Sequence, residues 1–147
     1  MESKKIIYIV ICVILIACNK SNASNFSKGR SYYLSISGDD KNDGSAANPI
    51  KTIAYLNTIN LSPGDTILLK GSEIFNGNLV LDSTKSGGDG KPVVITSYGN
   101  GNAIIDGGNG TAITIYNLSY ININNLTCKG EGRKDERERG KGRKEKE

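Results

Sequence analysis

The feature that most constrains this chain is a series of short apolar runs separated by turn-forming residues. The runs are rich in isoleucine, valine and threonine, and glycine, asparagine and aspartate lie between them. No helical pattern separates neighbouring runs, which argues against alternating strand and helix units. The predicted strands are TILLKG (66–71), NLVLDS (78–83), PVVITSYG (92–99), AIIDGG (103–108), AITIYN (112–117) and YININNLTCKG (120–130).

Two arrangements fit these runs. Hairpins would use two-residue turns such as Asn76-Gly77 or Asn100-Gly101 between strands of equal length. A solenoid would place asparagines at the corners between short strands, as Asn117, Asn124 and Asn125 can do. The spacing of the runs alone leaves both arrangements open.

Residues 1–17 predict an export signal. Two lysines precede an apolar run from Ile6 to Ala17, and its 12 residues are fewer than the roughly 20 of a membrane-spanning helix. A buried core segment is the alternative, but the position at the N-terminus and the lysine flank favour export.

The end of this run resembles the lipobox of bacterial lipoproteins. Residues 15–18 read LIAC, and a polar stretch follows. The resemblance implies cleavage before Cys18 and lipidation of Cys18, which would attach the protein to a membrane of the bacterial cell envelope. We expect an outer-membrane lipoprotein that faces the periplasm or the cell surface. An ordinary signal peptide, with Cys18 incidental, is the alternative.

Cysteine, charge and histidine content exclude several classes of function. Cys12 lies in the predicted signal and Cys18 would carry lipid, which leaves Cys128 with no cysteine to pair with. The formal net charge is +4, but acidic and basic residues balance between Cys18 and Cys128, so no nucleic-acid footprint is present there. The chain has no histidine, which excludes histidine-based triads and imidazole metal ligands.

The segment before the strands divides into a polar tether (18–30) and a predicted cap region (31–65). SYYLSIS (31–37) alternates as a strand does. Asn48 and Pro49 predict the start of a short helix, because asparagine caps a first turn and proline fits its first position.

The loop SGDDKNDGS (37–45) has two interpretations. Asp39, Asp43 and Asn42 can offer oxygens to calcium, so a calcium cofactor is possible. The run lacks the ligand pattern and distal glutamate of a calcium-binding EF-hand loop, and aspartate beside glycine also builds turns. We predict a turn or cap.

The order of motifs from residue 31 to 130 resembles the N-terminal part of pectate-lyase-like proteins, a superfamily of right-handed parallel β-helices. The resemblance implies an all-β fold, a right-handed parallel β-helix (solenoid) with an N-terminal cap containing a short helix and first coils only (66–130). The matching positions are Tyr33, Gly38, Asp40, Asn42, Asp43, Gly44, Pro49, Lys51, Thr52, Ile53, Pro63, Gly64, Asp65, Thr66 and Gly71.

The same resemblance implies carbohydrate chemistry. Polysaccharide lyases of this fold use carboxylates, often with calcium, to neutralise a uronic acid, and a lysine or arginine removes the neighbouring proton. We interpret the residues of these types here as turn and surface residues, with the catalytic residues unknown. They are Asp82, Asp89, Asp106, Lys85 and Lys91.

The tail (131–147) departs from this pattern. It contains no apolar residue, and all of its residues except Asp135 can be written with purine-only codons. We expect a frameshift or truncation there; a basic tail for an anionic partner is the alternative.

Taken together, the sequence predicts an exported, lipid-anchored, monomeric β-helix protein that acts on or binds acidic polysaccharide. Full-length relatives would be polysaccharide lyases, or glycoside hydrolases, and this chain alone would be inactive and marginally folded. A non-catalytic surface protein for glycan binding or adhesion is the alternative.

Overall fold

A computed structural model describes residues 29–131, which form an all-β unit with one short α-helix. All pairings between the named strands are parallel, which excludes hairpins between these strands. The strands are β1 (Ser31–Leu34), β2 (Thr66–Lys70), β3 (Ile74–Asn76), β4 (Leu79–Leu81), β5 (Val93–Tyr98), β6 (Ala103–Asp106), β7 (Ile113–Ile115), β8 (Ile121–Ile123) and β9 (Leu126–Lys129). Helix α2 (Ile53–Asn57) precedes β2, and a 3-10 helix, η1 (Ser83–Lys85), follows β4.

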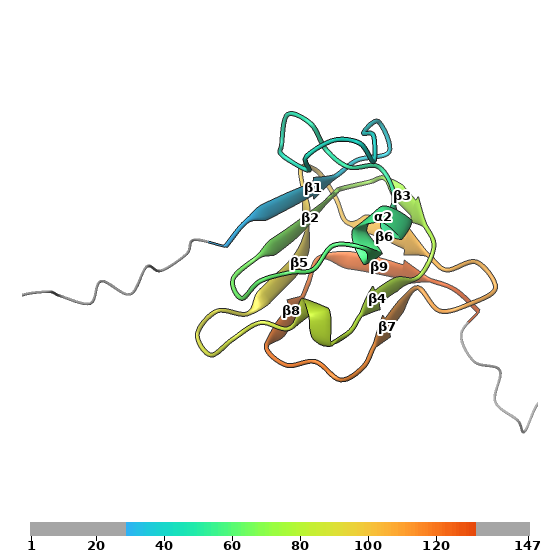
Figure 1. The fold of residues 1–147 in the computed structure, drawn as a ribbon. Coiled ribbons are helices and arrows are strands. Elements are labelled where there is room, and N and C mark those ends of the chain that lie inside the picture. The colour runs from blue at the N-terminus through green and yellow to red at the C-terminus, as the bar shows by residue number, and fades with distance from the viewer. Residues whose placement is uncertain (1–28, 132–147) are drawn as a thin grey trace, which may run out of the picture.

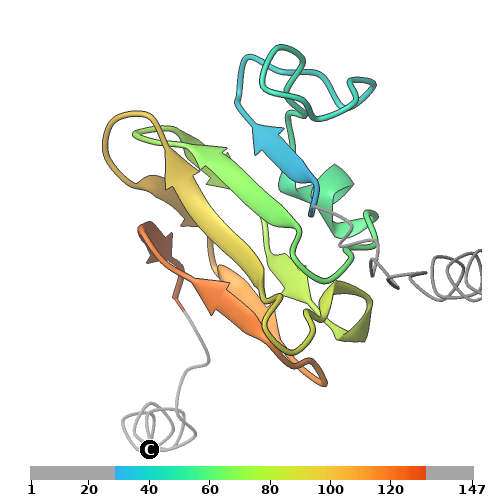
Figure 2. The ribbon, with the colours of Figure 1, turned by 90° about the vertical axis from the view of Figure 1, so that its left-hand side faces the viewer.

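The strands form three sheets. Sheet A has the order β1-β2-β5-β8, sheet B the order β3-β6-β9, and sheet C pairs β4 with β7. From β2 onward, successive strands enter sheets A, B and C in turn, so β2–β4, β5–β7 and β8–β9 form a first, second and third layer. Figure 1 shows β1, β2, β5 and β8 following one another away from the N-terminal loops, and Figure 2 looks onto sheet A. Parallel sheets in this order fit a β-helix.

Strand register stacks apolar side chains from one layer onto the next. In sheet A, Ile67 pairs with Ile95, and Ile95 pairs with Ile123. Burying each such side chain contributes about 1.5–3 kcal/mol. The buried apolar residues are Leu34, Ile50, Ile53, Leu56, Leu61, Ile67, Leu69, Phe75, Leu79, Leu81, Val93, Ile95, Ala103, Ile105 and Ala112.

At the N-terminal end of the stack, the chain itself pairs with the outer edge of β1. Along the outer edge of β1, Tyr33 N donates to Gly44 O (2.8 Å), Ile50 N donates to Tyr33 O (2.9 Å) and Ser35 N donates to Ile50 O (3.0 Å). Because an unpaired strand edge is a template for another strand, the loop that contains Gly44 and Ile50 protects sheet A.

A side chain protects sheet C in the same way. The amide of Asn57, the last residue of α2, donates to Asn78 O (2.8 Å) and accepts from Val80 N (3.0 Å). Asn57 therefore takes the place of a neighbouring strand beside β4.

The predicted helix start at Asn48-Pro49 is wrong. Helix α2 begins at Ile53, and Thr52 is its N-cap, with the hydroxyl accepting from Tyr55 N (3.1 Å). Ile50 instead forms a parallel bridge with Leu34. Pairing with the edge of β1 holds this segment extended, which local capping signals could not show.

Two further differences concern strand boundaries. The run 120–130 was predicted as one strand but forms β8 and β9, with Asn125 between them in the left-handed region (φ 52°). Asn117 also has a positive φ (50°), after β7, as expected for a corner. Strand β3 was not predicted from the sequence.

Several predictions fall outside the described residues: the signal (1–17), Cys18, most of the tether and all of the charged tail except Glu131. Within residues 29–131, no helix is long and apolar enough to cross a membrane.

Candidate functional site

The aspartate loop caps helix α2. One carboxylate oxygen of Asp40 accepts from Lys51 N and Thr52 N (2.9 Å each), and the other accepts from the Thr52 hydroxyl (2.7 Å). Burial raises the pKa of Asp40, but the hydrogen bonds from Thr52 and Lys51 outweigh it and lower the pKa below its ordinary value.

The other two aspartates close local turns. Asp39 accepts from Lys41 N (2.9 Å), and Asp43 accepts from Ser45 N (3.0 Å). These bonds confirm the predicted turn and cap. Among residues 29–131, no group of three or more histidine, cysteine, aspartate or glutamate side chains is placed to hold a metal ion.

Asp82 and Lys85, two of the residues of the types that polysaccharide lyases use, lie close together and stabilise the fold. Lys85 is 2% exposed, and its Nζ donates to Asn57 O (3.1 Å) and lies 3.9 Å from Asp82 Oδ1. Asp82 is the N-cap of η1 and accepts from Thr84 N (3.0 Å). Lys85 therefore ties η1 to the end of α2 and is not open to a ligand.

The other three lie apart in turns. Asp106 ends β6 and accepts from Gly108 N (2.8 Å). Asp89 is exposed between Gly88 and Lys91, whose backbones form two hydrogen bonds of 2.9 Å. These residues therefore occupy turn positions, as the sequence predicted.

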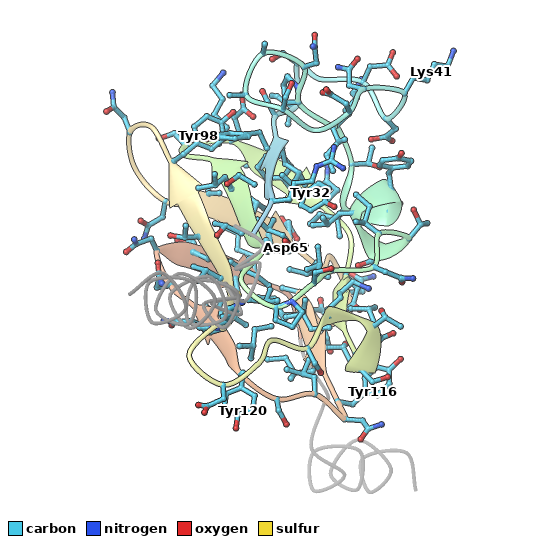
Figure 3. All side chains as sticks on the ribbon, turned by 60° about the vertical axis from the view of Figure 1, so that its left-hand side comes forward. Tyr32, Lys41, Asp65, Tyr98, Tyr116 and Tyr120 are labelled. Carbon is cyan, nitrogen blue, oxygen red and sulfur yellow. The ribbon has the colours of Figure 1, made fainter. Side chains whose placement is uncertain are left out.

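A better candidate site is the outer face of sheet A, where two tyrosines meet. The rings of Tyr33 on β1 and Tyr98 on β5 lie 5.2 Å apart between centroids, edge to face at 82°. Both side chains are part-exposed, and Leu68 on β2 is the register partner of Tyr33. Figure 3 shows Tyr98 at one end of the molecule, with Tyr116 and Tyr120 at the other.

An ion pair lies beside the tyrosines. Lys70, the register partner of Tyr98, lies 3.1 Å from Glu73. Glu73 is held from its other side, because its carboxylate accepts from Ile36 N (2.8 Å) and from the Ser35 hydroxyl (3.2 Å). The Lys70 side chain is 47% exposed, so its ammonium group contacts solvent while it is held by Glu73.

The pKa of the Tyr98 hydroxyl is raised, so the protonated form is favoured. Burial raises the pKa of Tyr98 above 10.0; Lys70 lowers the pKa, and Glu73 and Tyr33 raise it. A protonated hydroxyl both donates and accepts hydrogen bonds.

Polar side chains continue this face toward β8. The Thr96 hydroxyl on β5 and the Asn124 side-chain oxygen are 2.6 Å apart, and the Asn125 amide donates to Thr96 (3.3 Å). Together, Tyr33, Tyr98, Lys70, Glu73 and Thr96 form what we call the sheet A face. Its rings present apolar surface, and its charged and hydroxyl groups can bond the hydroxyls of a polar ring compound.

This face was not predicted from the sequence, because Tyr33 and Tyr98 are 65 positions apart. They meet only because β2 lies between their strands in sheet A. Residues that pair between β2 and β5 are 28 positions apart in the sequence, for example Thr66 and Val94. Predicting this face from the sequence would have required aligning the two layers with that offset.

No family model matches the chain. It is 35% identical over 85 residues to a lacto-N-biosidase of Bifidobacterium longum, covering 55% of this chain and 5% of that protein. It is 28% identical over 95 residues to the uncharacterized protein YwoF of Bacillus subtilis, covering 65% of this chain and 19% of that protein.

Among solved structures, the chain resembles the GH136 lacto-N-biosidase from Eubacterium ramulus, with a TM-score of 0.64 and 28% identity. That match covers 71% of this chain and 21% of the other. A rhamnogalacturonan lyase matches with a TM-score of 0.52 and 17% identity over 68% of this chain and 28% of the other, a likeness of fold alone. The chain thus spans about a fifth or less of the curated relatives it matches.

Proposed function

We propose that this protein acts on glycans, and that the sheet A face is where its described part binds them. The observation that carries the proposal is the pairing of Tyr33 and Tyr98 beside the Lys70–Glu73 ion pair. A tyrosine ring offers apolar surface to the C–H face of a sugar, while the neighbouring polar groups bond its hydroxyls. The similarity to lacto-N-biosidases supports glycans as the ligand class.

The fold that belongs to this proposal is a right-handed parallel β-helix. Three parallel sheets visited in turn support it, and strand crossovers between parallel strands are right-handed in nearly all proteins. We assign the described residues to its N-terminal cap and first layers.

The comparisons favour a different glycan from the acidic polysaccharide expected from the sequence. Among the reported relatives at 28–35% identity, those whose names state an activity are lacto-N-biosidases, whereas the likeness to the lyase is limited to fold. Acidic and basic residues balance between Cys18 and Cys128, so this part of the chain has no excess positive charge to attract a polyanion. We therefore place glycans containing lacto-N-biose first and acidic glycans, with β-elimination as the reaction, second.

Binding is assigned to the described residues ahead of cleavage. The carboxylates of Asp40, Asp65 and Asp82 all accept backbone hydrogen bonds that stabilise the fold. A carboxylate committed in this way is a poor candidate for proton transfer to a substrate. Hydrolysis by the whole protein is the second candidate function, and the lacto-N-biosidase similarity favours it.

A binding experiment tests the sheet A face. The full chain is applied to an array of lacto-N-biose-containing oligosaccharides and rhamnogalacturonan fragments. We expect Tyr98→Ala to weaken binding about tenfold or more, since one buried aromatic contact is worth about 1–3 kcal/mol. Tyr55→Ala is the matched control, because Tyr55 is 37% exposed on α2, outside this face.

The outcomes separate the parts of the proposal. The proposal is supported if Tyr98→Ala loses the binding of lacto-N-biose glycans and Tyr55→Ala keeps it. Binding confined to rhamnogalacturonan replaces the glycan class but keeps the face. Equal loss in both variants, or no binding by the wild-type chain, rejects the face.

Attachment to a membrane through Cys18 also remains a proposal. Labelling of bacteria with an alkyne fatty acid should mark the wild-type protein and leave Cys18→Ser unlabelled. Labelling of both would mean that Cys18 is not the lipidated residue.

A further inference from the structure

Three asparagines of this chain are followed directly by glycine: Asn76, Asn100 and Asn109. Because glycine has no side chain, its backbone nitrogen can approach the side chain of the preceding asparagine closely. A nitrogen that is free to move can attack the carboxamide carbon and convert the asparagine to an acid. All three asparagines are exposed, so exposure alone does not distinguish them.

Two of the three steps are restrained by backbone hydrogen bonds. Gly77 N donates to Asp106 O (2.8 Å), and Gly110 N donates to Gly107 O (2.9 Å). Each of these nitrogens must break its bond to a carbonyl before it can attack a side chain. Asn76 is also the last residue of β3, and pairing with β6 holds it extended.

The step from Asn100 to Gly101 has no such restraint. These residues lie in the bend between β5 and β6, where Gly101 has a positive φ (75°). Within residues 29–131, no group accepts a hydrogen bond from Gly101 N, and none bonds the side chain of Asn100. The Asn100 carbonyl is held, because it accepts from the Ser72 hydroxyl (2.9 Å). The two groups that would react are therefore the unbonded ones.

The bend is exposed although both neighbouring layers are present at this corner. Ser72 lies at the same corner of the first layer, between β2 and β3. Asn125 lies there in the third layer, between β8 and β9, and its carbonyl accepts from the Ser97 hydroxyl. A further layer would stack on the third layer, so it would not cover the bend.

We propose that Asn100 is a site of spontaneous deamidation in the folded protein. Gly101 N loses its proton to a solvent base and bonds to Cγ of Asn100. The bond from Cγ to Nδ2 breaks, and the amide nitrogen takes a proton from solvent and leaves as ammonia. Water then opens the cyclic imide, giving aspartate if the new bond at Cγ breaks and isoaspartate if the bond at the backbone carbonyl breaks.

The product changes the charge beside the sheet A face. No charged residue occurs between Lys91 and Asp106, so the new carboxylate introduces a negative charge into that segment. Asn100 follows Tyr98 by two positions, and Tyr98 O accepts from Gly71 N (2.8 Å). The charge therefore accumulates with the age of the protein at the end of β5. The reaction does not depend on the proposed glycan ligand.

Incubation of the folded full chain at mildly alkaline pH tests this proposal. Peptides are sampled over days, and fragmentation in a mass spectrometer assigns each deamidated residue. We expect Asn100 to react about tenfold faster than Asn76 or Asn109, since a backbone hydrogen bond must first break at the other two. In concentrated urea the three rates should converge, because the same residue pair then reacts without the fold.

Variants give a second readout on anion exchange. Asn100→Gln should abolish the acidic form that appears during incubation, and Asn109→Gln, also at an exposed position, should leave it unchanged.

Several outcomes would overturn the proposal. Equal rates at the three asparagines in the folded chain would mean that the backbone hydrogen bonds do not decide the site. An Asn100 that reacts in urea but not in the folded chain would mean that the fold restrains it as well. The same preference for Asn100 in urea would assign it to local sequence, and aspartate without isoaspartate would exclude the cyclic imide.

Discussion

The side chains of Asp40 and Thr52 are joined by a hydrogen bond of 2.7 Å, and Thr52 N donates to the same carboxylate at 2.9 Å. Thr52 in turn caps helix α2 by accepting from Tyr55 N. The loop that looked most like a metal site in the sequence is thus tied to the start of the one α-helix described. Its negative charge stabilises the protein through backbone N–H groups.

Acid should weaken the protein through Asp40. The pKa of Asp40 is below its ordinary value of 3.8, so the folded state binds the proton less tightly than the unfolded state. The stabilisation is complete above that ordinary value and is lost as the pH falls through the folded pKa. Urea unfolding between pH 7 and pH 2.5 should show a smaller loss in Asp40→Asn than in the wild-type protein. Equal losses would show that Asp40 does not titrate with folding.

Calcium should not stabilise the aspartate loop. Asp39, Asp40 and Asp43 already accept backbone hydrogen bonds, with which a calcium ion would have to compete. Thermal unfolding in calcium and in a chelator should give the same midpoint. A higher midpoint in calcium that is absent in Asp43→Asn would contradict this prediction.

Removing the amide of Asn57 should destabilise sheet C. Asn57→Ala leaves Val80 N and Asn78 O without their side-chain partner, which costs about 1–3 kcal/mol when such groups are buried. Denaturant unfolding measures this loss. Asn60→Ala, at an exposed position after α2, is the control and should stay within about 0.5 kcal/mol of wild type.

Lys85 should act through its packing as well as its charge. Lys85→Ala removes a buried four-carbon stem and the bond to Asn57 O, and we expect a loss of about 2–4 kcal/mol. Lys85→Met restores the stem without the ammonium group and should recover part of the loss. If the two variants unfold at the same denaturant concentration, the stem contributes nothing.

A methyl group at Gly71 should be more harmful than one at Gly110. A Cβ at Gly71 would lie 2.3 Å from Gly101 O and 2.4 Å from Asn100 O, both backbone atoms, whereas the nearest such atom at Gly110 is 3.4 Å away. We expect Gly71→Ala to cost about 2–4 kcal/mol and Gly110→Ala less than about 1 kcal/mol. Similar midpoints for the two variants would mean that the second-layer loop moves aside freely.

The sequence predicted most of the strands but not how they are divided. Apolar alternation located β2, β4, β5, β6 and β7 to within a few residues, because an inward face must be apolar wherever the layers stack. It missed β3, where only Phe75 is buried in a three-residue strand. It also joined β8 to β9, since a single residue with positive φ is enough to turn a corner.

The candidate site was harder to predict than the fold. The aspartate turns follow from local chemistry, as Asp39 and Asp43 bond N–H groups two residues ahead. The sheet A face depends on the register between β1, β2 and β5, which joins distant segments. Local patterns carry no information on that register, and the helix start at Pro49 failed for the same reason.

The direction of stacking bears on how the chain can fold during its synthesis. Strand β2 pairs with β1, β5 pairs with β2, and β8 pairs with β5, so each new strand in sheet A needs only a partner already made. The partners lie about 28 to 35 positions back, as Thr66 is opposite Ser31 and Ile121 is opposite Val93. A ribosome would therefore release the cap first and then one layer after another, with no strand waiting for a later segment.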